Sequence, residues 1–410
     1  MGKPTIRFEG YTDDWEQRKL SEISDVRDGT HDSPSYLSDG HPFVTSKNVK
    51  DGYINYDDVQ YISDEDFEAI NKRSKVDMND ILMGMIGTIG NLALIRTEPD
   101  FAIKNVALIK DTKQVSYMYL YHYLQSSSAE RQLLSGLDGG TQKFVSLKNI
   151  RELNIMVPSE AEQLKVGNFI ESLDHLITLH HRKCEETKKL KKFMLQKMFP
   201  KKGEKVPDIR FDGFTDDWEQ RKVSEIAIEK LSNGIMNNQS DDETGVKHIN
   251  VINMYDTDKI HPEKLTFSNY DEEAVKKCNV EFGDIFLTRS SLKPEGIAEA
   301  NVLLDSGRFV YDDHLIRLKV NKEKYDPFFV KLNLSGNAFK RQFIVRAKTT
   351  AFTTIGQEDI SECLGFFPKK EEQQQIGEYF MTLDHLITLH QHKCEELQNI
   401  KKFMLQNMFT

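Results

Sequence analysis

Two short stretches of the chain carry residue types that could do phosphodiester or methyl-transfer chemistry. In the first, Pro99-Asp100 followed by Asp111-Thr112-Lys113 formally fits a pattern in which carboxylates hold Mg²⁺ for phosphodiester hydrolysis. The pattern is short and degenerate, and Asp111-Thr112-Lys113 is typical of a turn between a strand and a helix. The sequence therefore favours a structural turn, with a metal-dependent nuclease as the alternative.

The second stretch, Asp326-Pro327-Phe328-Phe329, has the acid, proline and aromatic residues of the D/N-P-P-Y/F motif of amino-methyltransferases. Its second proline is absent, and no glycine-rich strand-turn-helix for a nucleotide cofactor precedes it. Proline is common in the first turn of a helix. We therefore expect a helix that begins near Pro327 and is packed by the two phenylalanines.

Histidines and cysteines at matching places raise the question of a metal site. His180 and His390 could form a two-histidine pair, but no carboxylate or cysteine with ligand spacing accompanies them. We expect both at an interface between helices and predict no metal. The cysteines contain no CxxC pair, which favours reduced thiols over disulfides or a zinc site; they are Cys184, Cys278, Cys363 and Cys394.

The segments that must position such residues occur in two nearly identical copies. Residues 6–23 read IRFEGYTDDWEQRKLSEI, and residues 209–226 read IRFDGFTDDWEQRKVSEI. Residues 173–199 return at 383–409 with most positions unchanged, whereas the sequence between these frames diverges. Constant frames around two variable inserts predict one scaffold that presents two different binding surfaces.

We predict an α+β fold with a pseudo-twofold internal repeat. Two domains of mixed α/β structure, 1–158 and 204–367, are separated by helical regions at 159–203 and 368–410. Strands are predicted at 80–84, 91–95 and 284–288, and helices at 117–134 and 327–346. Thr12 is a plausible N-cap for a short helix in the opening motif, with Trp15 and Leu20, like Trp218 and Val223, anchored in the core.

The helical regions give the clearest structural prediction. Ser159 with Glu162 three residues later fits a capping box at the start of the first helix. A stripe of mostly 3–4 spacing then predicts that the two long helices pair with each other. Its positions are Leu173, Ile177, His180, Cys184 and Met194 in the first copy and Leu383, Ile387, His390, Cys394 and Met404 in the second. Each repeated segment would be about 40 Å long, close to one turn of DNA.

Bulk properties narrow the function only a little. The 410 residues carry a net charge of −10 with pI ≈ 5.7, which does not favour a general nucleic-acid binder. Local patches decide such binding, however, and the stretch 182–205 is strongly basic. No apolar run approaches transmembrane length, and the polar start is unlike a signal peptide. We expect a cytoplasmic protein with no membrane contact.

These features together resemble the specificity subunits of type I restriction–modification systems, over essentially the full length of the chain. The similarity lies in the duplicated motif ending in DDWEQRKLSEI, in Arg27-Asp28-Gly29-Thr30-His31, in the segment 80–95, in the segment 139–147 (GGTQKFVSL), and in a proline followed by Glu-Gln before each helical region. The second copy departs from this pattern, with SSLKPEG after its strand and AKTTAF in place of GGTQKF, as expected if the two halves read different sequences.

The resemblance implies that each variable domain is a target recognition domain that reads one half of a bipartite double-stranded DNA target. The paired helices, antiparallel in the family, would set the spacer and dock two modification (methyltransferase) subunits, to which restriction/translocase subunits are added. The chain itself would have no catalytic centre and no cofactor. S-adenosylmethionine, ATP and Mg²⁺ would bind to the partner subunits.

Base reading needs side chains with hydrogen-bond donors and acceptors on exposed loops. Such residues in the first domain are Arg27, His31, Thr45, Ser46, Lys47, Asn48, Lys104, Gln142 and Lys143. In the second domain they are Asn250, Asn253, Arg289, Ser290, Ser291, Lys293, Lys348, Thr349 and Thr350. Phosphate contacts outnumber base contacts in such interfaces, so most of these residues are expected to position the DNA rather than read it. Two alternatives remain: a single-chain DNA nuclease or methyltransferase, and a coiled-coil scaffold without DNA contact.

Overall fold

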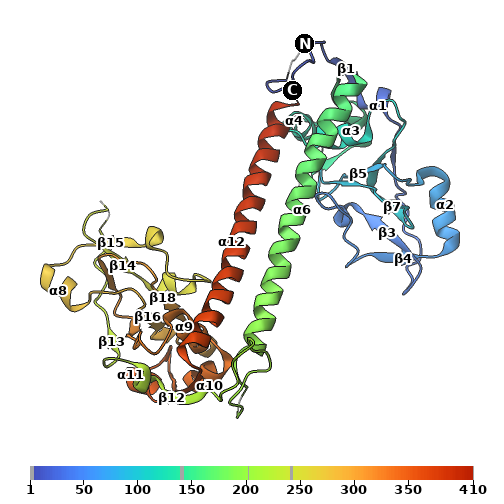
Figure 1. Cartoon of the computed structure of the whole chain (residues 1–410). Coiled ribbons are helices and arrows are strands. Elements are labelled where there is room, and N and C mark those ends of the chain that lie inside the picture. Colours follow the sequence, from blue (N-terminus) through green and yellow to red (C-terminus); the bar gives the residue numbers. More distant parts are fainter. Residues whose placement is uncertain (1–3, 139–142, 202, 241–242, 410) are drawn as a thin grey trace. The chain divides into compact units, whose positions relative to one another are not determined.

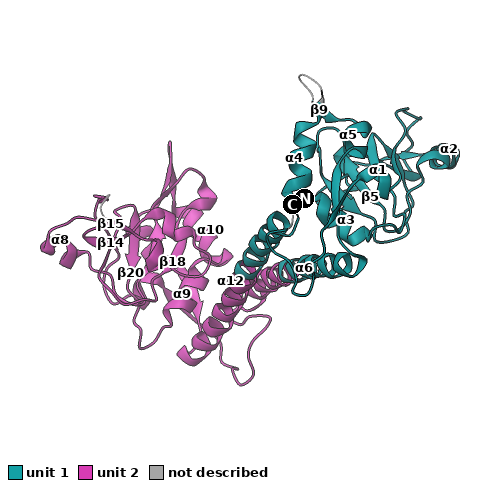
Figure 2. Ribbon diagram, turned by 90° about the horizontal axis from the view of Figure 1, so that it is seen from above, with its two compact units in different colours: residues 1–181, 392–410 teal, residues 182–391 magenta. Residues whose placement is uncertain are grey.

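The computed structural model describes residues 4–138, 143–201, 203–240 and 243–409. The chain divides into two compact units, coloured separately in Figure 2: residues 1–181 with 392–410, and residues 182–391. Both long helices contribute residues to both units, so each unit combines one variable domain with a part of each helix. The helical regions predicted from the sequence are thus shared between the units.

The first unit is built on a four-stranded sheet of order β2-β8-β5-β6 and a three-stranded sheet of order β4-β3-β7. Two short pairs, β1 with β11 and β9 with β10, complete its strands within the described residues. The elements are β1 Glu16–Lys19, α1 Leu20–Ile23, β2 Val26–Asp28, β3 His41–Thr45, the 3-10 helix η1 Ser46–Asn48, β4 Gln60–Ile62, α2 Asp64–Ser74, β5 Ile81–Gly84, β6 Leu92–Leu94, β7 Ala102–Lys104, β8 Val106–Ile109, α3 Tyr117–Leu124, α4 Ser127–Ser135, β9 Leu137–Asp138, β10 Phe144–Val145, α5 Leu147–Arg151, β11 Asn154–Val157 and the long α6 Glu160–Lys197.

The second unit repeats this plan, with sheets of order β13-β20-β16-β18 and β15-β14-β19, the pair β12-β23 and a small sheet β17-β22-β21. Its elements are β12 Glu219–Lys222, α7 Val223–Ile226, β13 Ser232–Asn233, β14 Val246–Ile249, η2 Val251–Tyr255, η3 Pro262–Lys264, β15 Thr266–Ser268, α8 Glu272–Lys277, β16 Ile285–Thr288, β17 Ser290–Ser291, η4 Pro294–Gly296, β18 Ala300–Val302, β19 Phe309–Tyr311, β20 Leu315–Leu318, α9 Pro327–Leu334, α10 Asn337–Arg346, β21 Lys348–Thr349, β22 Thr353–Thr354, α11 Gln357–Ser361, β23 Leu364–Phe367 and the long α12 Lys370–Asn407.

The predicted mixed α/β class and the three predicted strands are confirmed, as β5, β6 and β16. All the residues of these strands are buried, which explains why their sequences read as continuous apolar runs. The helix predicted at 117–134 is broken in two. The side chain of Ser126 accepts a hydrogen bond from the backbone N–H of Ala129 and so begins α4 as a separate helix. The second unit breaks at the same place, between α9 and α10.

The helix predicted to follow Thr12 is wrong. Residues 16–19 form strand β1, which pairs antiparallel with β11, with Glu16 opposite Val157 and Lys19 opposite Asn154. This pairing joins segments far apart in the sequence, so the local preference of an acidic first turn for a helix is overridden. The core anchors are confirmed: Trp15 and Leu20 are buried, as are Trp218 and Val223.

Helices α6 and α12, each 38 residues long, pair with each other, and the contacts within each unit run antiparallel (Figure 1). In the first unit the Cys394 thiol lies 3.7 Å from the carbonyl oxygen of Ile177, and Lys401 forms an ion pair of 2.7 Å with Asp174. In the second unit the Cys184 thiol lies 3.9 Å from the carbonyl oxygen of Ile387 on the other helix. There the ion pair joins Lys191, from the basic stretch, to Asp384.

The predicted stripe supplies these contacts. Five of its positions are buried, namely Leu173, Cys184, Leu383, Ile387 and Cys394. The other five positions are partly exposed, namely Ile177, His180, Met194, His390 and Met404. Met194 packs on the core of the second unit and Met404 on the core of the first. The stripe thus joins the helices to each other and, near its ends, to the variable domains.

Glu162 does not form the predicted capping box. Its carboxylate accepts hydrogen bonds from the Arg7 guanidinium at 2.7 and 2.8 Å and from the Trp15 indole at 3.2 Å. Glu162 is only 1% exposed, so it starts the helix with a buried ion pair instead of a local cap. In the second unit Arg210 holds the buried Glu372 in the same two-pronged way, at 2.6 and 2.7 Å.

The glutamine that follows each of these glutamates fixes a second helix. The backbone N–H of Ser116, the N-cap of α3, donates to Gln163 Oε1 at 2.9 Å, while Gln163 Nε2 donates to the carbonyl of Pro158 at 2.8 Å. Gln373 makes the same two contacts, to Asp326 and Pro368, at 3.0 and 2.8 Å. The repeated Pro, Glu and Gln residues are thus explained by structure.

Within the described residues, no helix is both long and apolar enough to cross a membrane.

Replacing Arg7 with methionine is expected to destabilise the first unit by about 3 kcal/mol, because Glu162 would be left as a buried carboxylate without its partner. Urea unfolding of a Trp218→Phe background, in which Trp15 is the remaining tryptophan and reports on the first unit, measures this loss. The matched control is Arg18→Met, since Arg18 pairs with an exposed glutamate, Glu22, and should change stability by no more than ~0.5 kcal/mol. Similar losses for both variants would contradict the role assigned to Arg7.

Candidate nucleic-acid interface

In the second unit the structure gathers most of the predicted DNA-contacting residues on or directly beside the small sheet β17-β22-β21. Ser290 pairs with Thr354 and Ser291 with Thr353, while Lys348 and Thr349 on β21 pair with the other edge of β22. Arg289 immediately precedes this sheet, and Thr350 follows it, with its backbone N–H donating to the carbonyl of Phe352 at 3.0 Å. Segments about sixty residues apart in sequence thus form one polar ribbon.

In the first unit the predicted residues meet around the ends of β3 and β7. Thr45 lies opposite Lys104 in the parallel pair of these strands, and Thr30 bridges to Lys104 from the other side. His31 is held in place because its ring nitrogens lie 2.6 Å from Asn105 Oδ1 and 3.0 Å from Asp28 Oδ2. Oxygen and cationic groups are therefore displayed together at this edge.

Three predicted contact residues are buried and hydrogen-bonded within the protein. Asn48 accepts the Thr45 backbone N–H at 2.9 Å and donates to the carbonyl of Asn55 at 3.1 Å. The Ser46 hydroxyl accepts the N–H of Met85 at 3.1 Å, and Asn253 accepts the N–H of Asn250 at 2.8 Å. Ser46, Asn48 and Asn253 are between 2% and 5% exposed, so their geometry favours a role in shaping the loops rather than in touching a base.

The other predicted residues lie at or near the surface. Lys47, Lys143, Lys293 and Lys348 are exposed, Asn250 is partly exposed, and Gln142 lies outside the described residues. Arg27 is tied to Asp25 at 2.6 Å and donates to the carbonyl of Arg73, so it is less available than the lysines. DNA contact by each of these side chains stays a prediction.

The two catalytic-looking stretches have structural roles. The Asp326 carboxylate accepts the backbone N–H of Phe329 at 2.8 Å as the N-cap of α9, and Pro327 is its first residue, as expected. Asp111 forms a turn in which it accepts the backbone N–H of Lys113 at 3.1 Å. The carboxylate of Asp100 lies 2.6 Å from Nδ1 of His41. No cluster of potential metal ligands found among the described residues contains Asp100, Asp111, His180 or His390.

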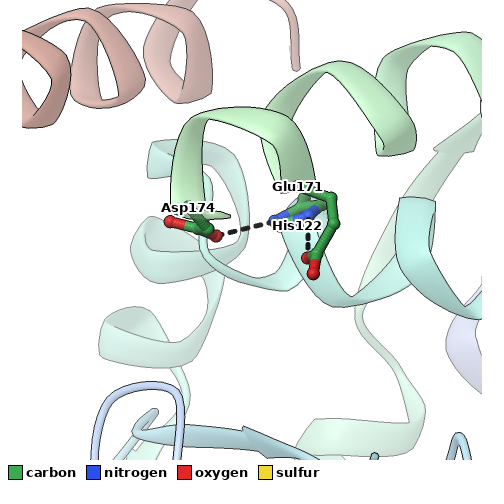
Figure 3. A group of neighbouring side chains, drawn as sticks. All are labelled: His122, Glu171 and Asp174. Atoms are coloured by element: carbon green, nitrogen blue, oxygen red, sulfur yellow. Dashed lines mark ion pairs between the residues drawn. The ribbon is translucent and has the colours of Figure 1, made fainter. Parts of the chain in front are cut away.

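A buried histidine cluster in the first unit was not predicted from the sequence. His122 on α3 is completely buried, and Figure 3 shows its ring between Glu171 and Asp174 of α6. The ring nitrogens lie 3.7 and 4.0 Å from these carboxylates, too far for hydrogen bonds, and have no other hydrogen-bond partner in the described part of the chain. A single histidine in an aromatic helix gave no spacing signal that could have revealed this cluster.

This cluster could hold a metal by residue type, but its charges oppose one. Arg96 binds Glu171 at 2.7 Å, and Lys401 binds Asp174 at 2.7 Å. Both carboxylates are therefore already neutralised, and a divalent cation would add uncompensated positive charge. The Arg96 guanidinium holds the pKa of Glu171 below its usual range, while burial lowers the pKa of His122 itself. The arrangement fits an ion-pair network around a neutral histidine.

Comparison with known proteins places this geometry in one family. Residues 12–189 and 215–399 both match the family model described as the Type I restriction modification DNA specificity domain. Two relatives from Methanocaldococcus jannaschii are each 24% identical: the putative type I restriction enzyme MjaX specificity subunit, covering 97% of this chain and 93% of its own, and the MjaVIII specificity subunit, covering 92% and 89%. A type I restriction–modification S subunit from M. genitalium has the same fold, with a TM-score of 0.64 and 12% identity over 100% of this chain and 99% of that one.

Lowering the pH from 8 to 5 is expected to reduce the free energy of unfolding in part through His122. An unfolded histidine binds its proton near pH ~6.5, whereas the folded one resists protonation, so the unfolded state gains protons first as the pH falls. Glu171 and Asp174 favour the protonated ring and Arg96 and Lys401 oppose it.

The variant His122→Leu removes this dependence. Leucine fits the site because Leu332 is the sixth residue of α9, as His122 is of α3, and is buried there. Urea unfolding followed by Trp15 fluorescence across this pH range measures the effect. A fall in stability as steep as that of the wild type would show that His122 does not titrate in this way.

Proposed function

The chain belongs to the type I restriction–modification DNA specificity family, and we propose that each of its units reads one half of a bipartite DNA target. The observation that carries this proposal is the repeat itself: near-identical frames position two polar surfaces that differ in sequence. The buried Arg–Glu pairs and the paired helices are the same in both halves, whereas the residues at the ribbon and at the ends of β3 and β7 are not. A scaffold that reads two unlike half-sites needs this combination.

Unpaired cations support contact with phosphates. Lys143, Lys293 and Lys348 are exposed, and no ion pair involving them occurs among the described residues, although many other surface lysines of the chain are paired. Phosphate neutralisation by lysine and arginine supplies most of the affinity of DNA-binding proteins. Arg289, equally exposed, can also donate two hydrogen bonds to a guanine edge in the major groove.

The paired helices fit the role of a spacer. Each is about 57 Å long at ~1.5 Å per residue, and an antiparallel pair holds its variable domains by the same contacts at equivalent positions. We propose that two modification subunits dock on this repeated frame and that restriction/translocase subunits join them. S-adenosylmethionine, ATP and Mg²⁺ are then bound by those partners, and this chain contributes positioning alone. The four cysteines are buried and not joined by disulfides, which fits a reducing cytoplasm.

Co-expression with a cognate modification subunit, in a host that lacks adenine methylation, is expected to produce N6-methyladenine in a split motif of two unlike halves with a fixed gap. Sequencing of the genomic DNA for the modified base measures this. Replacing residues 24–158 with the corresponding domain of another family member should change one half of the motif only. A change in both halves would contradict the assignment of one half-site to each unit, and no methylation despite a purified complex would favour a scaffold.

Replacing Lys143 or Lys348 with alanine is expected to weaken DNA binding and to reduce the slope of log K against log salt by about 1 for each phosphate that is no longer neutralised. Fluorescence anisotropy measures the affinity and its salt dependence, with a duplex that contains the motif identified by sequencing for N6-methyladenine. Lys222→Ala is the matched control, because Lys222 is paired with Glu362 at 2.6 Å and should leave the slope unchanged. A single-chain nuclease would instead cleave the duplex, and a scaffold would give no salt-dependent affinity.

A further inference from the structure

Two large apolar side chains stand at the end of the polar ribbon in the second unit. Strands β17 and β22 are antiparallel, with Ser291 opposite Thr353. The next residue along β17 is Leu292, and the residue before Thr353 is Phe352. Leu292 and Phe352 therefore lie at the same end of the β17-β22 ladder.

These side chains point away from the protein core. Leu292 is 81% exposed and Phe352 is 53% exposed, although both are large and apolar. Side chains alternate between the faces of a strand. Thr353 and Ile355 are buried, whereas Phe352 and Thr354 are exposed, so Phe352 lies on the outer face of the ribbon. Both side chains therefore leave more than half of their surface exposed to solvent.

Cationic side chains lie along the same ribbon. Lys293 follows Leu292 directly, whereas Arg289 and Lys348 lie at the other end of the short ladder, beside Ser290 and Thr354. All three are exposed, and their side chains have no hydrogen bond or ion pair with any residue the structure describes. A ribbon that carries an apolar tip and unpaired cations complements a surface that offers apolar groups between phosphates. The major groove of DNA is such a surface where it contains thymine, because the thymine methyl group projects into it.

The first unit differs at the same place. There the bridge between Ile86 and Phe144 is equivalent to the pair Ser290–Thr354. The next hydrogen bond is also equivalent: the Val145 N–H donates to the Met85 carbonyl, as the Ile355 N–H donates to the Arg289 carbonyl. The residue that follows the glycine turn at this edge is Thr88, whose hydroxyl donates to the carbonyl of Ser46. An exposed leucine at the tip is therefore a feature of the second unit, and not of the shared frame.

We propose that Leu292 and Phe352 read thymine by packing on its 5-methyl group in the half-site of the second unit. This inference rests on the proposed function, since it assigns a base to one of the two DNA-reading surfaces. Apolar contact distinguishes thymine from cytosine and from uracil without a hydrogen bond. Lys293 beside the tip, and Arg289 and Lys348 at the other end of the ribbon, contact the phosphates of the same half-site.

The test replaces thymine by deoxyuridine, one position at a time, in a duplex carrying the target motif, and measures binding of the full chain in complex with its modification subunit. One or two positions, all within one half-site, are expected to lose about fourfold in affinity, the amount that burial of one methyl group provides. Deoxyuridine pairs as thymine does, so only the methyl contact changes.

The variant Leu292→Ala should then bind the thymine and deoxyuridine duplexes equally, and Phe352→Ala should narrow the difference. The matched control Thr88→Ala should keep the fourfold ratio. Because Leu292 and Phe352 are exposed, these substitutions should leave the unfolding transition in place, which Trp218 fluorescence checks.

Equal binding of every deoxyuridine duplex by the wild type would overturn the thymine assignment while leaving the proposed function intact. A different outcome would be a rise in the fluorescence of 2-aminopurine placed in the duplex, lost in Leu292→Ala and independent of the thymine methyl group. That outcome would replace the thymine assignment by insertion of the leucine between bases. Absence of any DNA binding by the wild-type complex would overturn the proposed function and this inference together.

Discussion

The rest of the structure depends on a buried ion pair that is formed twice. Arg7 in the opening motif grips Glu162 at the start of α6, and Arg210 grips Glu372 at the start of α12. Each glutamate is 1% exposed, so the pair must be made if the helix is to begin there. The pair ties the opening motif to the first turn of the long helix, and the adjacent glutamine ties α3 or α9 to the same turn. These polar contacts, together with the packing of Val166 and Ile170 of α6 or Ile376 and Phe380 of α12 in the cores, hold each variable domain on its helix.

The helix pair carries a second set of repeated polar contacts. Asp174 with Lys401 and Asp384 with Lys191 are equivalent ion pairs, one in each unit, and cysteines pack against the opposite backbone nearby. Burial raises the pKa of Asp384, and Lys191 opposes that rise. Such pairs contribute less to stability than to register, because a shift of one helix along the other would leave a buried charge unpaired.

Residues whose roles depend on neighbours in sequence were predicted well. The buried strands β5, β6 and β16, the helix start at Pro327 and the apolar stripe of the long helices all follow from local pattern. Residues whose roles depend on distant partners were not. Glu162 fits a capping box on local grounds, yet it binds Arg7, 155 positions away. The sequence suggests that Asn48, Ser46 and Asn253 are exposed loop residues, yet all three are buried and form hydrogen bonds with backbone groups.

The sequence by itself determined the two-copy plan, the mixed α/β class, the pairing of two long helices and the family, because repeated letters and hydrophobic periodicity are properties of the chain alone. Only the tertiary structure decided that residues 16–19 are a strand, that His122 lies between two carboxylates, and that Leu292 and Phe352 leave the polar ribbon at the same end. Each of these results joins segments separated by tens of residues or more. Such contacts form only when the whole core is packed, and no local preference specifies them.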